Sequence, residues 1–130
     1  MVERFVETVE LTLPDDARVI KAIGDAVMVV GADPGGLAEW AVGFQQLNAG
    51  RRPLPRIGIH AGQALYRDGD YYGSAVNLAS RVGARAAGGE VLVTREVVDS
   101  AGDHLAFEPI GEVKLKGFRE ATDLFLARPK

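Results

Sequence analysis

Residues 18–24 and 26–32 form the pair of segments that most limits how this chain can fold. They read RVIKAIG and AVMVVGA, and both are rich in valine and isoleucine. The two segments join across Gly24-Asp25, and a glycine-containing dipeptide between two β-branched runs is typical of a tight hairpin turn. The sequence therefore predicts a buried β-hairpin, and it raises the question of why Lys21 and Asp25 stand in it.

Predicted helices and strands alternate along the rest of the chain. The first ten residues have apolar side chains at helical spacing and are interpreted as the end of a helix. Residues 8–13, TVELTL, also alternate between apolar and polar, so a short strand is the alternative there. Further strands are expected at 56–66, 90–94, 107–117 and 122–128, further helices at 33–50, 73–89 and 95–102, and a polar turn at 67–70. This alternation with short links predicts a layered α+β or α/β fold.

Length and composition narrow the class of protein. With 130 residues the chain is expected to be a single domain that is large enough to bury a core. Its formal net charge of -3 and the lack of a basic stripe argue against a nucleic-acid partner. The absence of cysteine excludes disulfides and thiolate chemistry. We find no signal peptide and no apolar run of membrane-spanning length, so a cytoplasmic domain without membrane contact is expected.

Lys21 and Asp25 each have an ordinary structural explanation. On a regularly alternating strand, Lys21 shares a face with Val19 and Ile23. A lysine on such a face can extend its ammonium group into solvent from the end of the strand. Asp25 follows a glycine, which is common turn chemistry. Taken one at a time, neither residue identifies a functional site.

The segment 73–89 predicts an amphipathic helix with a narrow polar stripe. Asn77 and Arg81 are four residues apart on that stripe and project together, with Ser74 and Arg85 beside them. An amide donor next to a guanidinium can bind a phosphate or an oxyanion, because both groups offer N–H donors in fixed geometry. The alternative is a solvated helix face, which is the commonest reason for a polar stripe.

Four motifs taken together resemble a known family. The segments KAIGDAVMVV, RIGIHAGQALYRDGDYYGSAVNLASRV, GGEVLVT and GEVKLKGF occur in this order. With this spacing they resemble the catalytic domain of class III nucleotidyl cyclases, in particular bacterial adenylate cyclases. The resemblance covers nearly the whole chain. It implies that residues 1–130 are a single cyclase domain without its N-terminal strand. It implies a ferredoxin-like α+β sandwich that works as a head-to-tail homodimer, with two sites at the interface.

The resemblance also implies a role for individual residues. Lys21 and Asp70 are similar to the pair that reads the adenine edge of ATP, and Asn77 and Arg81 to the pair that stabilises the transition state. Lys116 resembles the lysine that contacts the terminal phosphates. Asp25 resembles one of two aspartates that hold paired Mg²⁺ or Mn²⁺ ions, and in such a dimer it would face the other five residues across the interface. His60 and His104 have no role in this scheme.

The chemistry implied is the conversion of ATP to cyclic AMP and pyrophosphate, in which the 3'-hydroxyl attacks the α-phosphate. Two metal ions would activate that hydroxyl and neutralise the phosphate oxygens. Carboxylates are the hard oxygen ligands that Mg²⁺ prefers. Arg81 would meet the charge that develops on the α-phosphate, and Asn77 would orient the ribose.

The sequence departs from the family pattern at one point. In the family a second metal aspartate lies on the first strand, in a motif of the form Phe-x-Asp followed by Gly-Phe-Thr, and nothing like it precedes Asp25 here. We therefore expect a fold without its first strand. The strands could rearrange, a partner chain could fill the gap, or residues 9–13 could take the vacant place. Two functional classes remain open: an adenylate cyclase domain, or a non-catalytic module that binds nucleotide or dimerises.

Overall fold

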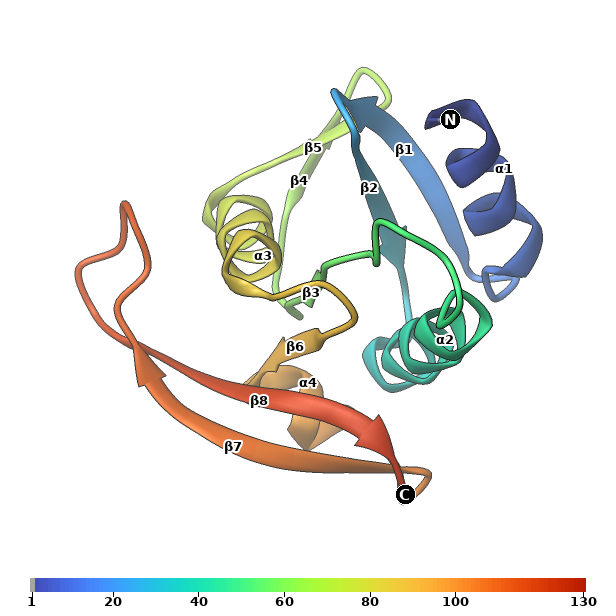
Figure 1. Cartoon of the computed structure of the whole chain (residues 1–130). Helices are drawn as coiled ribbons and strands as arrows, with labels where there is room; N and C mark the ends of the chain where they lie inside the picture. The colour runs from blue at the N-terminus through green and yellow to red at the C-terminus, as the bar shows by residue number, and fades with distance from the viewer. Residues whose placement is uncertain (1) are drawn as a thin grey trace.

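The structure is a computed structural model that describes residues 2–130, with side chains from residue 4 onward (Figure 1). Its helices are α1 (Val2–Thr12), α2 (Pro34–Leu47), α3 (Ser74–Arg85) and α4 (Arg95–Ser100). Its strands are β1 (Ala17–Ile23), β2 (Ala26–Gly31), β3 (Ile57–Ile59), β4 (Leu65–Arg67), β5 (Asp70–Tyr72), β6 (Val91–Thr94), β7 (Leu105–Val113) and β8 (Thr122–Pro129). The predicted α+β class is confirmed.

The hairpin predicted around Gly24-Asp25 is present. Strands β1 and β2 pair antiparallel, and the last pair before the turn joins Ile23 to Ala26. Gly24 has a φ of +61°, and a positive φ at the first of two turn residues is the arrangement of a type II′ turn. Glycine adopts this φ without steric cost, which explains its position immediately before Asp25.

A four-stranded sheet in the order β3-β6-β8-β7 forms the centre of the fold. Strands β3 and β6 are parallel, whereas β8 runs antiparallel to both β6 and β7. All four residues of β6, VLVT, are buried. A strand that is covered on both faces has a continuous apolar run instead of an alternating one, as β6 does.

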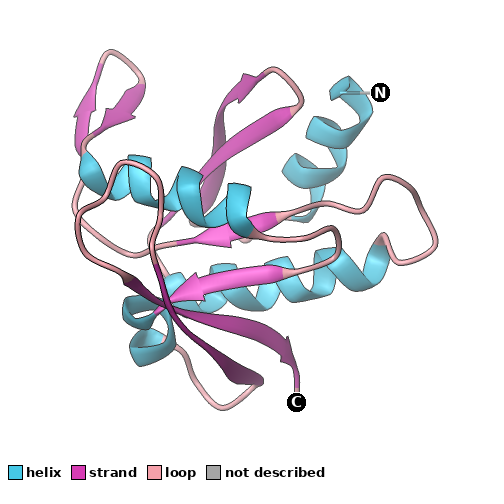
Figure 2. Cartoon of the chain, turned by 60° about the vertical axis from the view of Figure 1, so that its left-hand side comes forward, coloured by secondary structure: helices cyan, strands magenta, loops and turns pink. Residues whose placement is uncertain are grey.

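Helices cover both faces of this sheet (Figure 2). On one face, Ala38 and Val42 of α2 and Val97 of α4 pack against Val91 and Val93 of β6. On the other face, Val82 of α3 and Ala86, which follows the helix, pack against Leu92 and Leu124. Alternate residues of β6 and β8 therefore belong to two separate apolar clusters.

Helix α3 lies unusually close to β3. A Cβ atom built on Gly58 would lie 2.1 Å from the backbone nitrogen of Gly83 and 2.5 Å from its Cα. Only glycine at position 58 permits this approach, because real Cβ atoms do not come within 3.0 Å of such neighbours. The contact fixes the depth at which α3 sits on the sheet.

The helix end predicted in the first ten residues is confirmed, and the alternative strand at residues 8–13 is excluded because α1 continues to Thr12, so these residues do not take the place of a missing strand. Two predictions of secondary structure were wrong. The single strand expected at 56–66 is broken by residues 60–64 into β3 and β4. The strand expected at 107–117 begins earlier, at Leu105, and ends at Val113, since the chain turns at residues 116–117.

The ladders do not join into one sheet. Within the described residues 2–130, β1-β2 and β4-β5 are separate two-stranded ladders, and β3 pairs only with β6. In the same range no helix is long and apolar enough to cross a membrane.

Candidate functional site

Lys21 and Asp70 meet across 49 positions of sequence. The ammonium nitrogen of Lys21 lies 2.6 Å from one carboxylate oxygen of Asp70, and the backbone N–H of Tyr71 donates to the other oxygen at 2.7 Å. The Lys21 hydrogen bond is the largest cause that lowers the pKa of Asp70, followed by the Tyr71 hydrogen bond. The side chains are 41% and 20% exposed, so both polar groups remain accessible to a ligand.

A β-bulge decides where Lys21 points. The register of β1 shifts between Val19, which lies opposite Val29, and Lys21, which lies opposite Met28. Ile20 is the extra residue of this bulge. The expectation that Lys21 shares a face with Val19 is therefore wrong. Lys21 lies on the face of Arg18, because their partners on β2, Met28 and Val30, are two residues apart.

Asp70 lies on a hairpin that the sequence analysis did not predict. Strands β4 and β5 pair antiparallel around Asp68-Gly69, which have φ values of +52° and +78°. Two consecutive positive φ values are those of a type I′ turn, for which Asp-Gly is a preferred sequence. The signal was present in the sequence, but we interpreted residues 67–70 as a polar turn that follows one long strand.

Asp25 is exposed at the β1–β2 turn, and it does not form a metal site by itself. Among the described residues, no group of three or more histidine, aspartate or glutamate side chains could hold a metal ion. One carboxylate does not supply the ligands of two divalent ions. The residues described do not fit the two-metal site that the family resemblance implies, and we derive no reaction step through it.

Asn77 and Arg81 lie one turn apart on α3, and both are exposed. The opposite side of the helix is anchored by Val82, which is fully buried, and by the contact of Gly83 with β3. Asn77 and Arg81 therefore share one exposed face of α3, as the sequence predicts. Their role in catalysis remains a prediction.

Lys116 occupies a fixed turn between β7 and β8. The backbone N–H of Phe118 donates to the carbonyl of Leu115 at 3.1 Å, and Gly117 has a φ of +88°. These are features of a type II turn with Lys116 at its second position. Leu115 is buried and Phe118 partly buried in the cluster that contains Val82 of α3. The turn that exposes Lys116 therefore packs against the helix that carries Asn77 and Arg81.

The two histidines have partners other than these groups. His60, at the end of β3, has a side chain that is 10% exposed, and its Nδ1 lies 2.8 Å from the Thr94 hydroxyl. Burial lowers the pKa of His60, and the nearby Glu96 partly opposes that effect. His104 is exposed beside Glu39. The expectation that His60 is a satisfied core or edge residue agrees with its hydrogen bond.

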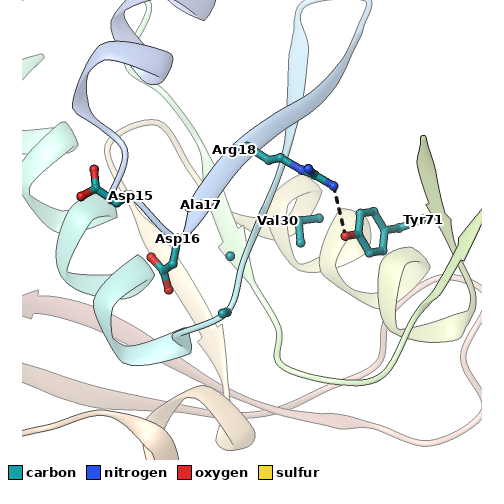
Figure 3. Close-up of a pocket in the computed structure, with 8 residues that line it drawn as sticks. Asp15, Asp16, Ala17, Arg18, Val30 and Tyr71 are labelled. Carbon is teal, nitrogen blue, oxygen red and sulfur yellow. Dashed lines mark hydrogen bonds between the residues drawn. The ribbon is translucent and has the colours of Figure 1, made fainter.

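Arg18, Tyr66 and Tyr71 form a cluster that the sequence analysis missed. Arg18 donates to the Tyr71 hydroxyl at 3.5 Å, and its guanidinium carbon lies 5.9 Å from the centre of the Tyr66 ring. The two tyrosine rings are 5.0 Å apart. Arg18 and Tyr71 line an open pocket, and Figure 3 shows the guanidinium directed at Tyr71 and away from Asp15 and Asp16.

Sequence comparison assigns the family. The profile of the adenylate and guanylate cyclase catalytic domain matches residues 45–128. The chain belongs to this family. The matched range contains Asp70, Asn77, Arg81 and Lys116, whereas Lys21 and Asp25 precede it.

Curated relatives match most of this cyclase domain. The chain is 37% identical over 116 residues to the pH-sensitive adenylate cyclase MT1302 of Mycobacterium tuberculosis, which covers 84% of this chain. It is 36% identical over 96 residues to an adenylate cyclase of Streptomyces griseus, which covers 72% of it. The chain spans only 29% and 24% of the length of these two relatives.

Solved structures confirm the cyclase-type fold. The chain superimposes on an adenylate cyclase of Trypanosoma brucei in its monomeric state with a TM-score of 0.78, over 97% of this chain and 76% of that one, at 21% identity. It superimposes on the adenylyl cyclase CyaB of P. aeruginosa with a TM-score of 0.75, over 99% of this chain and 79% of that one, at 23% identity.

Proposed function

We propose that this cyclase-family domain converts ATP to cyclic AMP and pyrophosphate. The observation that carries the proposal is the Lys21–Asp70 pair, which joins a donor and an acceptor at 2.6 Å on two hairpins far apart in sequence. Both groups are partly exposed, and each satisfies the other until a ligand replaces it. The curated relatives named as adenylate cyclases support the same reaction.

The pair has the polarity that adenine requires. Adenine presents an acceptor at N1 and an amino donor at N6, whereas lysine offers only donors and ionised aspartate only acceptors. In this proposal Lys21 donates to N1 and Asp70 accepts from N6. An aspartate carboxylate is ionised at neutral pH and is therefore an acceptor; without nucleotide, the Lys21 and Tyr71 hydrogen bonds lower the pKa of Asp70 further.

The remaining groups act on the phosphates and the ribose. Arg81 binds the α-phosphate as negative charge develops during attack by the 3'-hydroxyl, and a guanidinium does so with donors in fixed geometry. Asn77, one turn away on α3, orients the ribose. Lys116 binds the terminal phosphates from a turn that is anchored on both sides by apolar side chains. These phosphates leave together as pyrophosphate.

The cofactor expected in this proposal is a divalent ion, Mg²⁺ or Mn²⁺, although Asp25 alone does not fit a two-metal site and no step is assigned to the ion. Asp25 is the candidate ligand in this chain, and its position at the tip of a tight turn leaves its carboxylate exposed. We propose a homodimer in which Asp25 of one copy faces the other five residues of its partner. The lack of a three-residue ligand cluster in the described part of the chain favours the second candidate, a non-catalytic nucleotide-binding or dimerisation module.

A cyclic AMP assay with Mn²⁺ separates the two candidates. It would use the 130-residue chain beside an extended form to which a strand with a second aspartate has been added. Cyclic AMP production by the extended form that is lost in Arg81→Ala supports the cyclase. ATP binding without any product in the extended form supports the non-catalytic module.

A further inference from the structure

The β4–β5 hairpin needs contacts from outside itself to hold Asp70 in place. Each of its strands has three residues, and its ladder joins no other strand among residues 2–130. A two-stranded hairpin of this size is marginally stable in water at best. The hairpin is held by the contact of β5 with α3 and by the side chains that join it to the β1–β2 hairpin, and the latter set the position of Asp70 relative to Lys21.

Two such contacts lie side by side. Lys21 bonds Asp70, and Arg18 bonds the neighbouring Tyr71 through its hydroxyl. The bulge at Ile20 makes this parallel arrangement possible, because it turns Arg18 and Lys21 to the same face of β1. Without the bulge, side chains three residues apart on a strand would lie on opposite faces.

Arg18 is directed to the aromatic rings instead of to a carboxylate. No acid forms an ion pair with Arg18 among the side chains of residues 4–130. Its guanidinium lies over Tyr66, within the distance of a cation–π contact, and Tyr66 packs on Tyr71. Arg18 therefore contacts both strands of the hairpin that carries Asp70.

We propose that Arg18 is a positioning residue for base recognition, which holds the β4–β5 hairpin so that Asp70 stays opposite Lys21. The inference rests on the proposed function. When adenine enters, Lys21 and Asp70 exchange their mutual hydrogen bond for bonds to the base. The Arg18–tyrosine contacts do not involve those atoms, so they persist and keep the two groups at the spacing that the purine edge requires.

The test compares Arg18→Gln and Arg18→Lys with a control, Arg128→Gln, which breaks an exposed contact with Glu108 on the β7–β8 ladder. Two readouts are taken on each chain. Carboxyl-carbon NMR gives the pKa of Asp70 without nucleotide, and competition binding gives the ratio of the dissociation constants of GTP and ATP. Tyr71→Phe, which removes one hydroxyl and keeps the ring, serves as a second variant if Arg18→Gln does not fold.

We expect Arg18→Gln to raise the pKa of Asp70 toward its usual value and to reduce the preference for ATP about two- to fivefold, the effect of losing one exposed cation–π contact. Arg18→Lys should change the Asp70 pKa and the preference for ATP less than Arg18→Gln does. The control Arg128→Gln should change neither the pKa nor the preference. An unchanged Asp70 pKa in Arg18→Gln overturns the inference, and so does a raised pKa with an unchanged preference. If the unmutated chain does not prefer ATP, the proposed function fails, while the Asp70 pKa still decides whether Arg18 positions it.

Discussion

Gly58→Ala should destabilise this domain more than any other single added methyl group at the sheet–helix contact. The new Cβ would lie 2.1 Å from the nitrogen and 2.5 Å from the Cα of Gly83, and 2.7 Å from the carbonyl carbon of Val82. All three are backbone atoms of α3, so no side chain can rotate away. Helix α3 has to move off β3, and that movement opens the apolar cluster around Val82 and Leu124.

The expected cost lies at or above the upper end of the range for an overpacked core, which is about 1–3 kcal/mol. Domains of this size are stable by about 5–15 kcal/mol, so a loss of about 3 kcal/mol is large. With a urea m-value of about 1–3 kcal/mol/M, the midpoint of unfolding should fall by about 1–3 M. Urea titration followed by circular dichroism measures this shift.

Gly83→Ala is the matched control, because it adds a methyl group on the other side of the same contact. Its Cβ would lie 3.5 Å from the Gly58 nitrogen, which is ordinary van der Waals contact. In a helix, alanine is favoured over glycine by about 1 kcal/mol. We expect Gly83→Ala to be neutral or stabilising. A Gly58→Ala domain within about 0.5 kcal/mol of the unmutated one would refute the packing argument.

Three further predictions follow from the site and its surroundings. The 130-residue chain alone should make little or no cyclic AMP, because Asp25 is a single carboxylate where two metal ions need more ligands; robust turnover by pure chain would contradict this. The chain should associate, since the exposed apolar residues Ile23, Leu65 and Tyr72 lie on the hairpins and strand edges are open; sedimentation as a clean monomer at micromolar concentration would count against it. The unfolding free energy should fall as the pH drops below about 6.5, because burial lowers the pKa of His60 and the unfolded chain then binds the proton more tightly. His60→Gln should remove this part of the pH dependence, and an identical fall in that variant would show that His60 is not its source.

Local patterns in the sequence predicted the elements that carry most of the site. Gly24-Asp25 between β-branched runs predicted the β1–β2 hairpin, and the apolar run of β6 predicted a strand. The polar stripe of Asn77 and Arg81 predicted the exposed face of α3. These features depend on neighbours a few residues away, and for this reason periodicity and turn chemistry were sufficient.

Features that depend on residues far apart in the sequence could not be predicted from local patterns. The apolar residues around Ile20 give no local sign of a bulge, because only the pairing register of β1 with β2 shows which residue is extra. Without it, the face of Lys21 was assigned wrongly. The Arg18–Tyr71 contact joins residues 53 positions apart, and no local pattern predicts it. The β4–β5 hairpin, in contrast, has a local signal in its Asp68-Gly69 turn, which the expectation of one strand at 56–66 overlooked.

The choice between ATP and GTP tests the central claim that Lys21 and Asp70 read the base. Guanine has a donor at N1 and an acceptor at O6, so it would set donor against donor and acceptor against acceptor. Each mismatch should cost about 1–3 kcal/mol. Competition between ATP and GTP, on the 130-residue chain and on the extended form, should therefore favour ATP at least about tenfold. The double variant Lys21→Glu with Asp70→Ser should lose or reverse that preference. Equal use of ATP and GTP by the unmutated domain would contradict the account.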